Sequence, residues 1–324
     1  MTDRGRPAIF ICRHGEREDY QWKARGESWQ QQAERPWDTP LTPGGIAQGA
    51  AVGRAIAAHT NRLGLAPVQM VLTSPFLRCA QTAAAAAAPL GLEEVGVTTA
   101  LSEAMSESWY RSWGVPGADS TWGGPAGCTA GTPVDKLALH PAAFEPAGSL
   151  LLGHAALGSL LSEGAPAHAG SVRVTPHAPG LGPCASPTLS YKWGGFETHD
   201  QLATRMAGLC EGIRDRGFQA TVGGAPCSVL LVSHGGPTTG LYRTLTGHGR
   251  SPSTGYTGLF CYAALDKAVE EGAGAGAPES GGDARWECLL CADHEHLKEV
   301  GAPISGPCDM VEQAPTAANL AAEM

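Results

Sequence analysis

The stretch from Ala8 to Asp19 constrains the fold of this chain more than any other. A short apolar run, Ala8 to Cys12, ends abruptly in Arg13-His14-Gly15-Glu16-Arg17. The run is short, rich in Ile and Phe and preceded by a proline, which is typical of a β-strand. In an open α/β sheet, ligands bind beyond the carboxyl ends of the strands. We therefore expect the polar residues of this stretch to lie at a ligand site.

The residue types in this stretch suit a phosphate group. The guanidiniums of Arg13 and Arg17 offer forked donors to phosphate oxygens, and the imidazole of His14 offers a nucleophile. We expect Gly15 to let the backbone approach a ligand closely. A second polar strand end follows the apolar run 228–232, where the sequence reads Ser-His-Gly-Gly-Pro with the histidine at position 234.

Composition excludes several classes of protein. The chain has 324 residues, a formal net charge of −9 and no basic tract, which disfavours a nucleic-acid partner. Its ten cysteines show no disulfide-framework spacing, and no apolar run is long enough for a secretory signal or a membrane span. We expect a cytoplasmic protein with reduced thiols and no membrane partner, and an organelle stays open.

Strand and helix patterns alternate along the chain, and its length suits one large α/β domain with insertions or two small domains. Thr42 and Ser74 are each followed by proline, and this pattern predicts that both cap helices. Arg78 falls in the first turn of the second helix, where its side chain points back towards the sheet edge of His14. The predicted strands are 8–12, 68–72, 95–98, 228–232, 259–265 and 286–291, and the predicted helices are 43–59, 75–88 and 196–216.

Other segments lack such patterns. Residues 17–41 predict a long loop, whose Trp22, Trp29 and Trp37 either wall a pocket that favours aryl phosphates or pack the loop onto the domain. Gly (44) and Pro (24) are abundant, which suggests that part of the length is loop. We expect a Gly/Pro-rich cap insertion at 110–193, a flexible loop at 267–283 and a disordered tail at 301–324.

The motifs together resemble the histidine phosphatase superfamily, branch 1, which has the phosphoglycerate mutase-like fold. The resemblance rests on Arg13-His-Gly-Glu-Arg, Leu41-Thr-Pro-Gly-Gly, Ser74-Pro-x-x-Arg-x-x-Gln-Thr and His234, in family order. It implies a single domain over residues 1–300, with a three-layer α/β/α sandwich around a mostly parallel sheet. It also implies a phosphohistidine intermediate on His14 without a cofactor, and phosphoryl binding by Arg13, Arg17, Arg78 and His234.

The resemblance further implies a proton donor after the third strand. Glu103 occupies that place, and Glu107 is the alternative. The Glu-Arg-His-Tyr-Gly segment of the mutases is absent, which favours a phosphatase over a phosphoglycerate mutase or a sugar-bisphosphate phosphatase. Glu16-Arg17 with Asp19 is similar to the ecdysteroid-phosphate phosphatases and the suppressors of T-cell receptor signalling.

The last expectations concern the substrate, partner chains and metal ions. We expect a small-molecule or phosphoprotein phosphomonoester as substrate, and a non-catalytic binding protein and a homodimer stay open. Cys288-x-x-Cys291 with His294 and His296 is a weak zinc pattern, because only one such cluster occurs. We therefore expect no metal.

Overall fold

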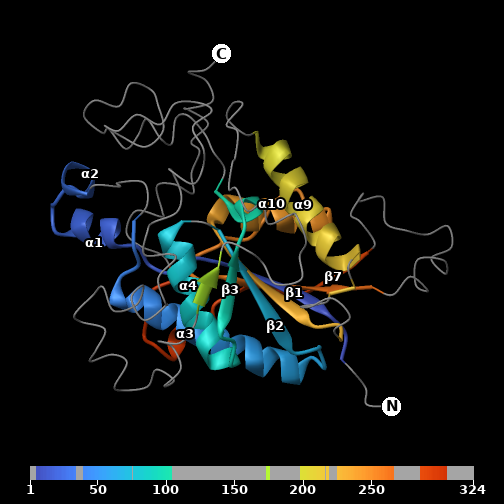
Figure 1. Ribbon diagram of the computed structural model, residues 1–324. Coiled ribbons are helices and arrows are strands. Elements are labelled where there is room, and N and C mark those ends of the chain that lie inside the picture. Colours follow the sequence, from blue (N-terminus) through green and yellow to red (C-terminus); the bar gives the residue numbers. More distant parts are fainter. Residues whose placement is uncertain are drawn as a thin grey trace.

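The structure is a computed structural model that describes residues 5–33, 39–74, 76–103, 198–215, 217–218, 225–265 and 285–304, and the backbone of 173–175. In this part of the chain one sheet has seven strands in the order β4-β3-β2-β5-β1-β6-β7 (Figure 1). The pairs from β4 to β1 are parallel, and β6 and β7 are antiparallel to their neighbours. The predicted, mostly parallel sheet is thus confirmed. The strands are β1 (Ala8–Arg13), β2 (Val68–Thr73), β3 (Glu94–Val97), β4 (Arg173–Thr175), β5 (Ser228–Ser233), β6 (Leu259–Ala264) and β7 (Trp286–Asp293).

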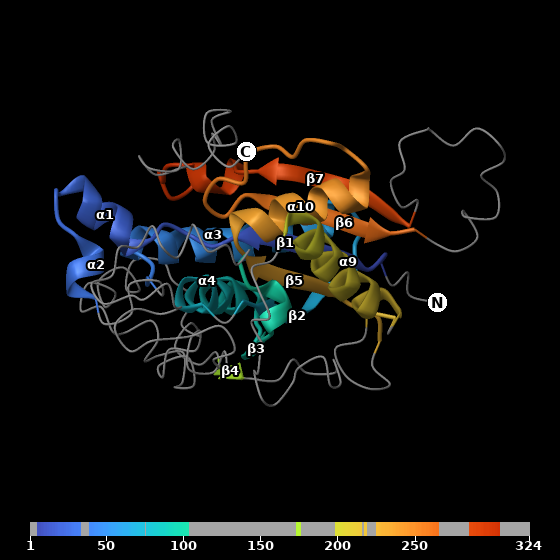
Figure 2. The ribbon, with the colours of Figure 1, turned by 90° about the horizontal axis from the view of Figure 1, so that it is seen from above.

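Helices cover both faces of the sheet, which confirms the three layers (Figures 1 and 2). One apolar cluster joins the strands to α3 and α4, and a second joins them to α9 and α10. Because side chains alternate along a strand, Leu230 belongs to the first cluster and Leu231 to the second. The helices are α1 (Glu18–Ala24), α2 (Trp29–Gln32), α3 (Pro43–Arg62), α4 (Leu77–Ala87), α9 (His199–Asp215) and α10 (Gly235–Thr246), with the short 3-10 turns η1 (Ala88–Leu90), η2 (Thr99–Leu101) and η6 (Glu295–Lys298).

The register of the two central strands sets the position of the site. β1 and β5 are buried along their whole length, as expected for apolar strands covered on both faces. They pair in parallel, with Arg13 opposite Ser233. The next residue of each strand is a histidine. His14 and His234 therefore leave the sheet side by side at its carboxyl edge.

Two predicted helix caps have different outcomes. Thr42 caps α3 as predicted, because its Oγ1 accepts a hydrogen bond of 2.9 Å from the backbone nitrogen of Gly45. The prediction for Ser74 is wrong, since α4 begins at Leu77 after Phe76. The Ser74 hydroxyl instead lies 2.8 Å from Nε2 of His234. His234, at the end of β5, thus forms a hydrogen bond with the hydroxyl that the sequence pattern predicted to cap the helix.

The segment 17–41 contains two short helices where the sequence predicted a loop. α1 has Glu18 and Asp19 in its first turn and Lys23 in its last, which complements the helix dipole. The short, polar segment has no apolar stripe from which a helix would be expected. Both helices lie beside α3, away from α9 and α10 (Figure 1).

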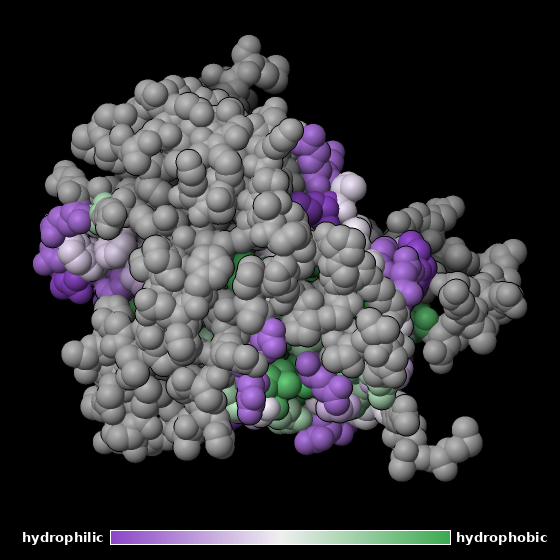
Figure 3. Space-filling view, in the orientation of Figure 1, coloured by the Kyte–Doolittle hydropathy of each residue, from purple (hydrophilic) through white to green (hydrophobic). Residues whose placement is uncertain are grey.

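α9 shows the predicted pattern of one buried face. Leu202, Met206 and Ile213 are buried, and Leu209 is half-buried against the same cluster. The opposite face is hydrophilic, and Figure 3 shows such residues over the upper end of α9 and over α1. The predicted core face of this helix is thus confirmed.

Several predicted segments fall mainly outside the described residues. Of the insertion 110–193 only the backbone of β4 is described, and it adds a strand to the edge of the sheet. The loop 267–283 lies wholly outside. The tail is described as far as Ile304, whose carbonyl oxygen accepts a 2.6 Å hydrogen bond from the backbone nitrogen of Tyr256. Among the described helices, none is long and apolar enough to cross a membrane. The single domain over residues 1–300 stays a prediction.

Candidate active site

His14 follows β1 and is held in one tautomer by its surroundings. Its side chain is buried, and its Nδ1 lies 2.8 Å from the carbonyl oxygen of Gly15. A carbonyl oxygen only accepts hydrogen bonds, so Nδ1 carries the proton. Nε2 then carries the lone pair, and no described residue forms a hydrogen bond with it. The ring thus presents an unprotonated nitrogen that forms no hydrogen bond with a described residue.

His234 follows β5 and is held in the opposite tautomer. Its Nδ1 lies 3.1 Å from Nη2 of Arg78, and a guanidinium only donates. Nδ1 is therefore unprotonated, and the Nε2 proton points to the hydroxyl of Ser74 at 2.8 Å. The rings of His14 and His234 meet edge to face, with centroids 5.5 Å apart.

The three predicted arginines converge on these imidazoles. Arg13, Arg17 and Arg78 are only 7, 5 and 1 % exposed, so their charges lie inside the protein. Arg17 is oriented by Asp19, which accepts from its Nε at 3.0 Å and from its Nη2 at 2.5 Å. Arg13 donates from Nη1 to the carbonyl oxygen of Thr254 at 3.4 Å. The arrangement keeps buried positive charge beside a nucleophile.

Both histidines are neutral because of this environment. Burial lowers the pKa of His14 well below its usual value, and Arg78 and Arg13 lower it further. Burial, then Arg78, Arg13 and Arg17, shift the pKa of His234 in the same direction. The guanidiniums thus create a positive electrostatic potential around the two histidines, which favours the binding of an anion.

Glu103 reaches the same place from the turn after β3. Its Oε2 lies 4.0 Å from Nδ1 of His234, and its side chain is 20 % exposed. It lines a cleft with Arg13, His14 and Arg17. The alternative acid, Glu107, lies outside the described residues.

The glycines of the first motif are explained by packing against α3. A Cβ on Gly15 would lie 2.4 Å from the carbonyl oxygen of Gly45, and one on Gly45 would lie 2.3 Å from that of Glu16. The motif also donates to α4, from the backbone nitrogen of Gly15 to Oγ1 of Thr82 at 3.0 Å. Gly15 is therefore required by a neighbouring helix, and the close approach of a ligand that the sequence suggested stays a prediction.

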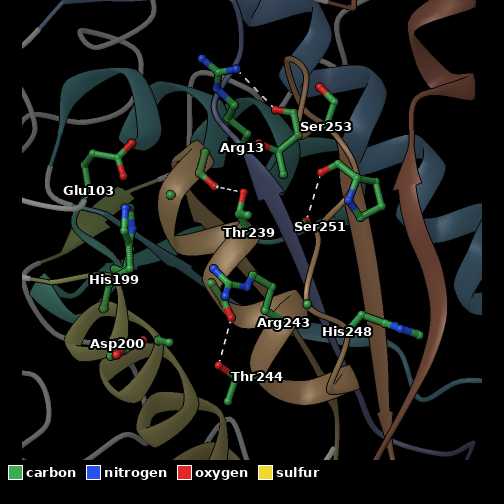
Figure 4. Close-up of a pocket in the computed structure, with 18 of the residues that line it drawn as sticks. Arg13, Glu103, His199, Asp200, Thr239, Arg243, Thr244, His248, Ser251 and Ser253 are labelled. Atoms are coloured by element: carbon green, nitrogen blue, oxygen red, sulfur yellow. Dashed lines mark hydrogen bonds between the residues drawn. The ribbon is translucent and has the colours of Figure 1, made fainter. Parts of the chain in front are cut away.

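The cleft has a volume of about 940 Å³ and contains residues that sequence reasoning missed (Figure 4). In Figure 4, Glu103 and His199 lie on one side, Ser251 and Ser253 on the other, and Thr239 between them. Arg78 and His234 are not part of this lining and lie buried behind it. Small residues on α10 line the cleft. Gly235 and Gly236 belong to the Ser-His-Gly-Gly-Pro stretch, whereas no short motif marks Thr239 and Gly240. The missed lining residues include His199, Asp200, Thr239, Arg243, His248, Ser251 and Ser253.

The tryptophans of the segment 17–41 pack on each other. The rings of Trp22 and Trp29 meet at 88° with centroids 5.5 Å apart, and Arg25 lies over Trp22. Neither Trp22 nor Trp29 lines the cleft, and Trp37 lies outside the described residues. For Trp22 and Trp29 the structure therefore favours packing within the segment over a role as a wall of this cleft.

The zinc pattern near the last strand is not assembled. Cys288 packs with the cluster under α9 and α10, whereas Nε2 of His296 lies 2.9 Å from the hydroxyl of Thr257. In the described ranges no three His, Cys, Asp or Glu side chains are placed to hold a metal ion.

One comparison with known proteins matches a family over part of the chain. Residues 9–112 match the family model of the histidine phosphatase superfamily (branch 1). No curated protein matches the sequence significantly.

Several solved structures are similar to the chain at low identity. A mycobacterial glucosyl-3-phosphoglycerate phosphatase is 16 % identical, with 88 % of this chain and 98 % of that chain covered and a TM-score of 0.43. A phosphoglycerate mutase from Bacillus anthracis is 14 % identical, with 93 % and 100 % covered and a TM-score of 0.44. Bacillus stearothermophilus YhfR is 16 % identical, with 90 % and 99 % covered and a TM-score of 0.42. The segment from β1 to η2 holds His14, Arg78 and Glu103, and this part of the chain is similar to the histidine phosphatase superfamily (branch 1).

Proposed function

We propose that the protein hydrolyses phosphomonoesters through a phosphohistidine on His14. The tautomer of His14 supports this most directly, because its bond to the Gly15 carbonyl leaves Nε2 as the free lone pair. Nε2 attacks phosphorus in line, forming the N–P bond while the P–O bond to the leaving group breaks. Glu103 gives its proton to the leaving oxygen. Water then attacks the phosphohistidine and releases inorganic phosphate.

The buried cations are assigned to the phosphoryl group. Arg13, Arg17 and Arg78 neutralise the charge on its oxygens in the transition state. A phosphoryl dianion offsets the field that lowers the pKa of His234, so we expect this ring to take up a proton and donate when substrate binds. Guanidinium and imidazolium supply the charge that a metal ion supplies in other phosphatases.

The second step needs a base. After Glu103 has given up its proton it is a carboxylate, and the same group then accepts a proton from the attacking water. The side chain is partly exposed in the cleft, which gives water access to it. The described lining of the cleft contains no tryptophan, so it supplies no stacking surface of that kind for aromatic leaving groups. The substrate is proposed as a phosphomonoester of a small molecule or protein.

The test compares wild type with His14→Ala on a panel of alkyl, sugar and aryl phosphates. His59→Ala is a matched control, because His59 lies outside the cleft beside Arg62. We expect release of inorganic phosphate by wild type and by the control, and its loss in His14→Ala. Full turnover by His14→Ala would contradict the assignment of His14 as the nucleophile. Transfer of the phosphoryl group to a second substrate oxygen, without free phosphate, would identify a mutase.

A further inference from the structure

An arginine of α9 holds the turn that precedes Glu103. The side chain of Arg205 donates from Nη1 to the carbonyl oxygen of Ala100 at 2.6 Å. It donates from Nη2 to the carbonyl oxygen of Ser102 at 3.0 Å. The two prongs of one guanidinium thus bind two carbonyls that lie two residues apart. Such charge-assisted, forked bonds fix geometry more strongly than a single neutral bond.

A second anchor holds the same turn from the sheet. The hydroxyl of Ser233, the last residue of β5, donates to the carbonyl oxygen of Leu101 at 2.6 Å. The carbonyls of Ala100, Leu101 and Ser102 are therefore each bound from outside the turn. Ser233 also precedes His234, so the turn and the second histidine share a support.

These anchors matter because the turn has little regular structure of its own. η2 spans only Thr99–Leu101, and Glu103 follows it outside any strand or helix. Its carboxylate must nevertheless reach a leaving oxygen in the cleft, beside Nδ1 of His234 at 4.0 Å. A displacement of about 1 Å in a catalytic group lowers rates on the order of 10²-fold.

We propose that Arg205 is a positioning residue, which places Glu103 for proton transfer by gripping the backbone of the turn before it. The inference rests on the proposed function. Arg205 is not part of the cleft lining, so it acts through the carbonyls of Ala100 and Ser102 and not on the substrate.

This role predicts a dependence on the leaving group. A strongly basic alkoxide leaves slowly without a proton, whereas a weakly basic phenoxide leaves readily without one. The ratio kcat/KM covers the steps up to cleavage of the P–O bond and leaves out hydrolysis of the phosphohistidine. A misplaced acid therefore steepens the plot of log kcat/KM against leaving-group pKa. A general loss of structure lowers the whole line instead.

The experiment measures this slope for wild type, Arg205→Met, Arg205→Lys and Glu103→Gln. Methionine keeps the apolar stem and removes the donors, and lysine keeps the charge without the fork. Arg214→Met is the matched control, because Arg214 lies on the same helix but binds Glu211 at 2.9 Å. We expect Arg205→Met to lose about 10- to 100-fold with an alkyl phosphate and less than about threefold with 2,4-dinitrophenyl phosphate. The control should keep the wild-type slope.

The variants of Arg205 and Glu103 should not be additive. Once Glu103→Gln has removed the acid, adding Arg205→Met should leave the slope as it is. An equal loss for every leaving group would overturn the proposal, as would a wild-type slope in Arg205→Lys. If Arg205→Met fails to fold, the slope of Arg205→Lys decides alone. Turnover that persists in His14→Ala would overturn the proposed function itself, and the substrate panel with that variant measures this separately from the slopes.

Discussion

Replacement of Arg78 separates a forked phosphate ligand from a simple positive charge. Arg78 is 1 % exposed, its Nη2 lies 3.1 Å from Nδ1 of His234, and its guanidinium lies over Phe76 at 4.6 Å. Arg78→Ala removes a preorganised donor in a buried site, an effect of about 3–4 kcal/mol, or 10² to 10³ in kcat/KM. Since the charge also stabilises bound phosphate, the inhibition constant of inorganic phosphate should rise.

The kcat/KM of Arg78→Lys should exceed that of Arg78→Ala by less than about tenfold. One ammonium cannot reproduce the forked donor geometry of a guanidinium, and burial disfavours its charged form. The assay is kcat/KM with an aryl phosphate, with circular dichroism and thermal melting to show that each variant is folded. Arg62→Ala, at an exposed arginine beside His59, serves as control. Wild-type kinetics in Arg78→Lys would refute the reasoning.

Four further predictions address the chemistry and the packing. Rapid quenching with labelled substrate should trap an acid-labile, base-stable phosphoryl group on wild type and none on His14→Ala, and EDTA should leave turnover intact. In the native protein the pKa of His14 is lowered from 6.5, so below that pH the unfolded state binds a proton that the native state does not. The free energy of unfolding should therefore fall from pH 7 to pH 5, and it should fall by less in His14→Gln. Gly45→Ala should lower the melting temperature and kcat together, because its Cβ would lie 2.3 Å from the Glu16 carbonyl oxygen, and an unchanged melting curve would count against this contact. Trp22→Ala should change kcat/KM by the same factor for aryl and alkyl phosphates, whereas a selective loss with aryl phosphates would restore the pocket-wall interpretation.

Much of the site could be predicted because parallel strands end at one edge of a sheet. His14 and His234 each follow an apolar run, and any parallel pairing brings their ends together. Arg78 could be added because it lies in the first turn of a helix that follows another such strand. These inferences use only local patterns and a general rule of topology.

The remaining features depend on contacts between distant segments. Ser74 looks like a helix cap until His234, far along the chain, takes its hydroxyl. Arg205 lies half-buried on an amphipathic helix, and nothing in its neighbours in sequence points to carbonyls more than a hundred positions away. The cleft lining likewise arises from the packing of α9 against α10. The spacing of residues within one segment therefore does not predict contacts with such distant parts of the chain.

The position of β5 in the sheet bears on how the chain can fold during synthesis. β5 lies between β1 and β2, although it follows them by more than a hundred residues. Until Ser233 has left the ribosome, the facing edges of β1 and β2 have no strand to pair with, and buried backbone groups need such partners. The segment 9–112, which carries the family match, therefore cannot close its own sheet. Nascent chains pass through a stage in which β1 and β2 have open edges, the stage at which aggregation or chaperone binding is expected.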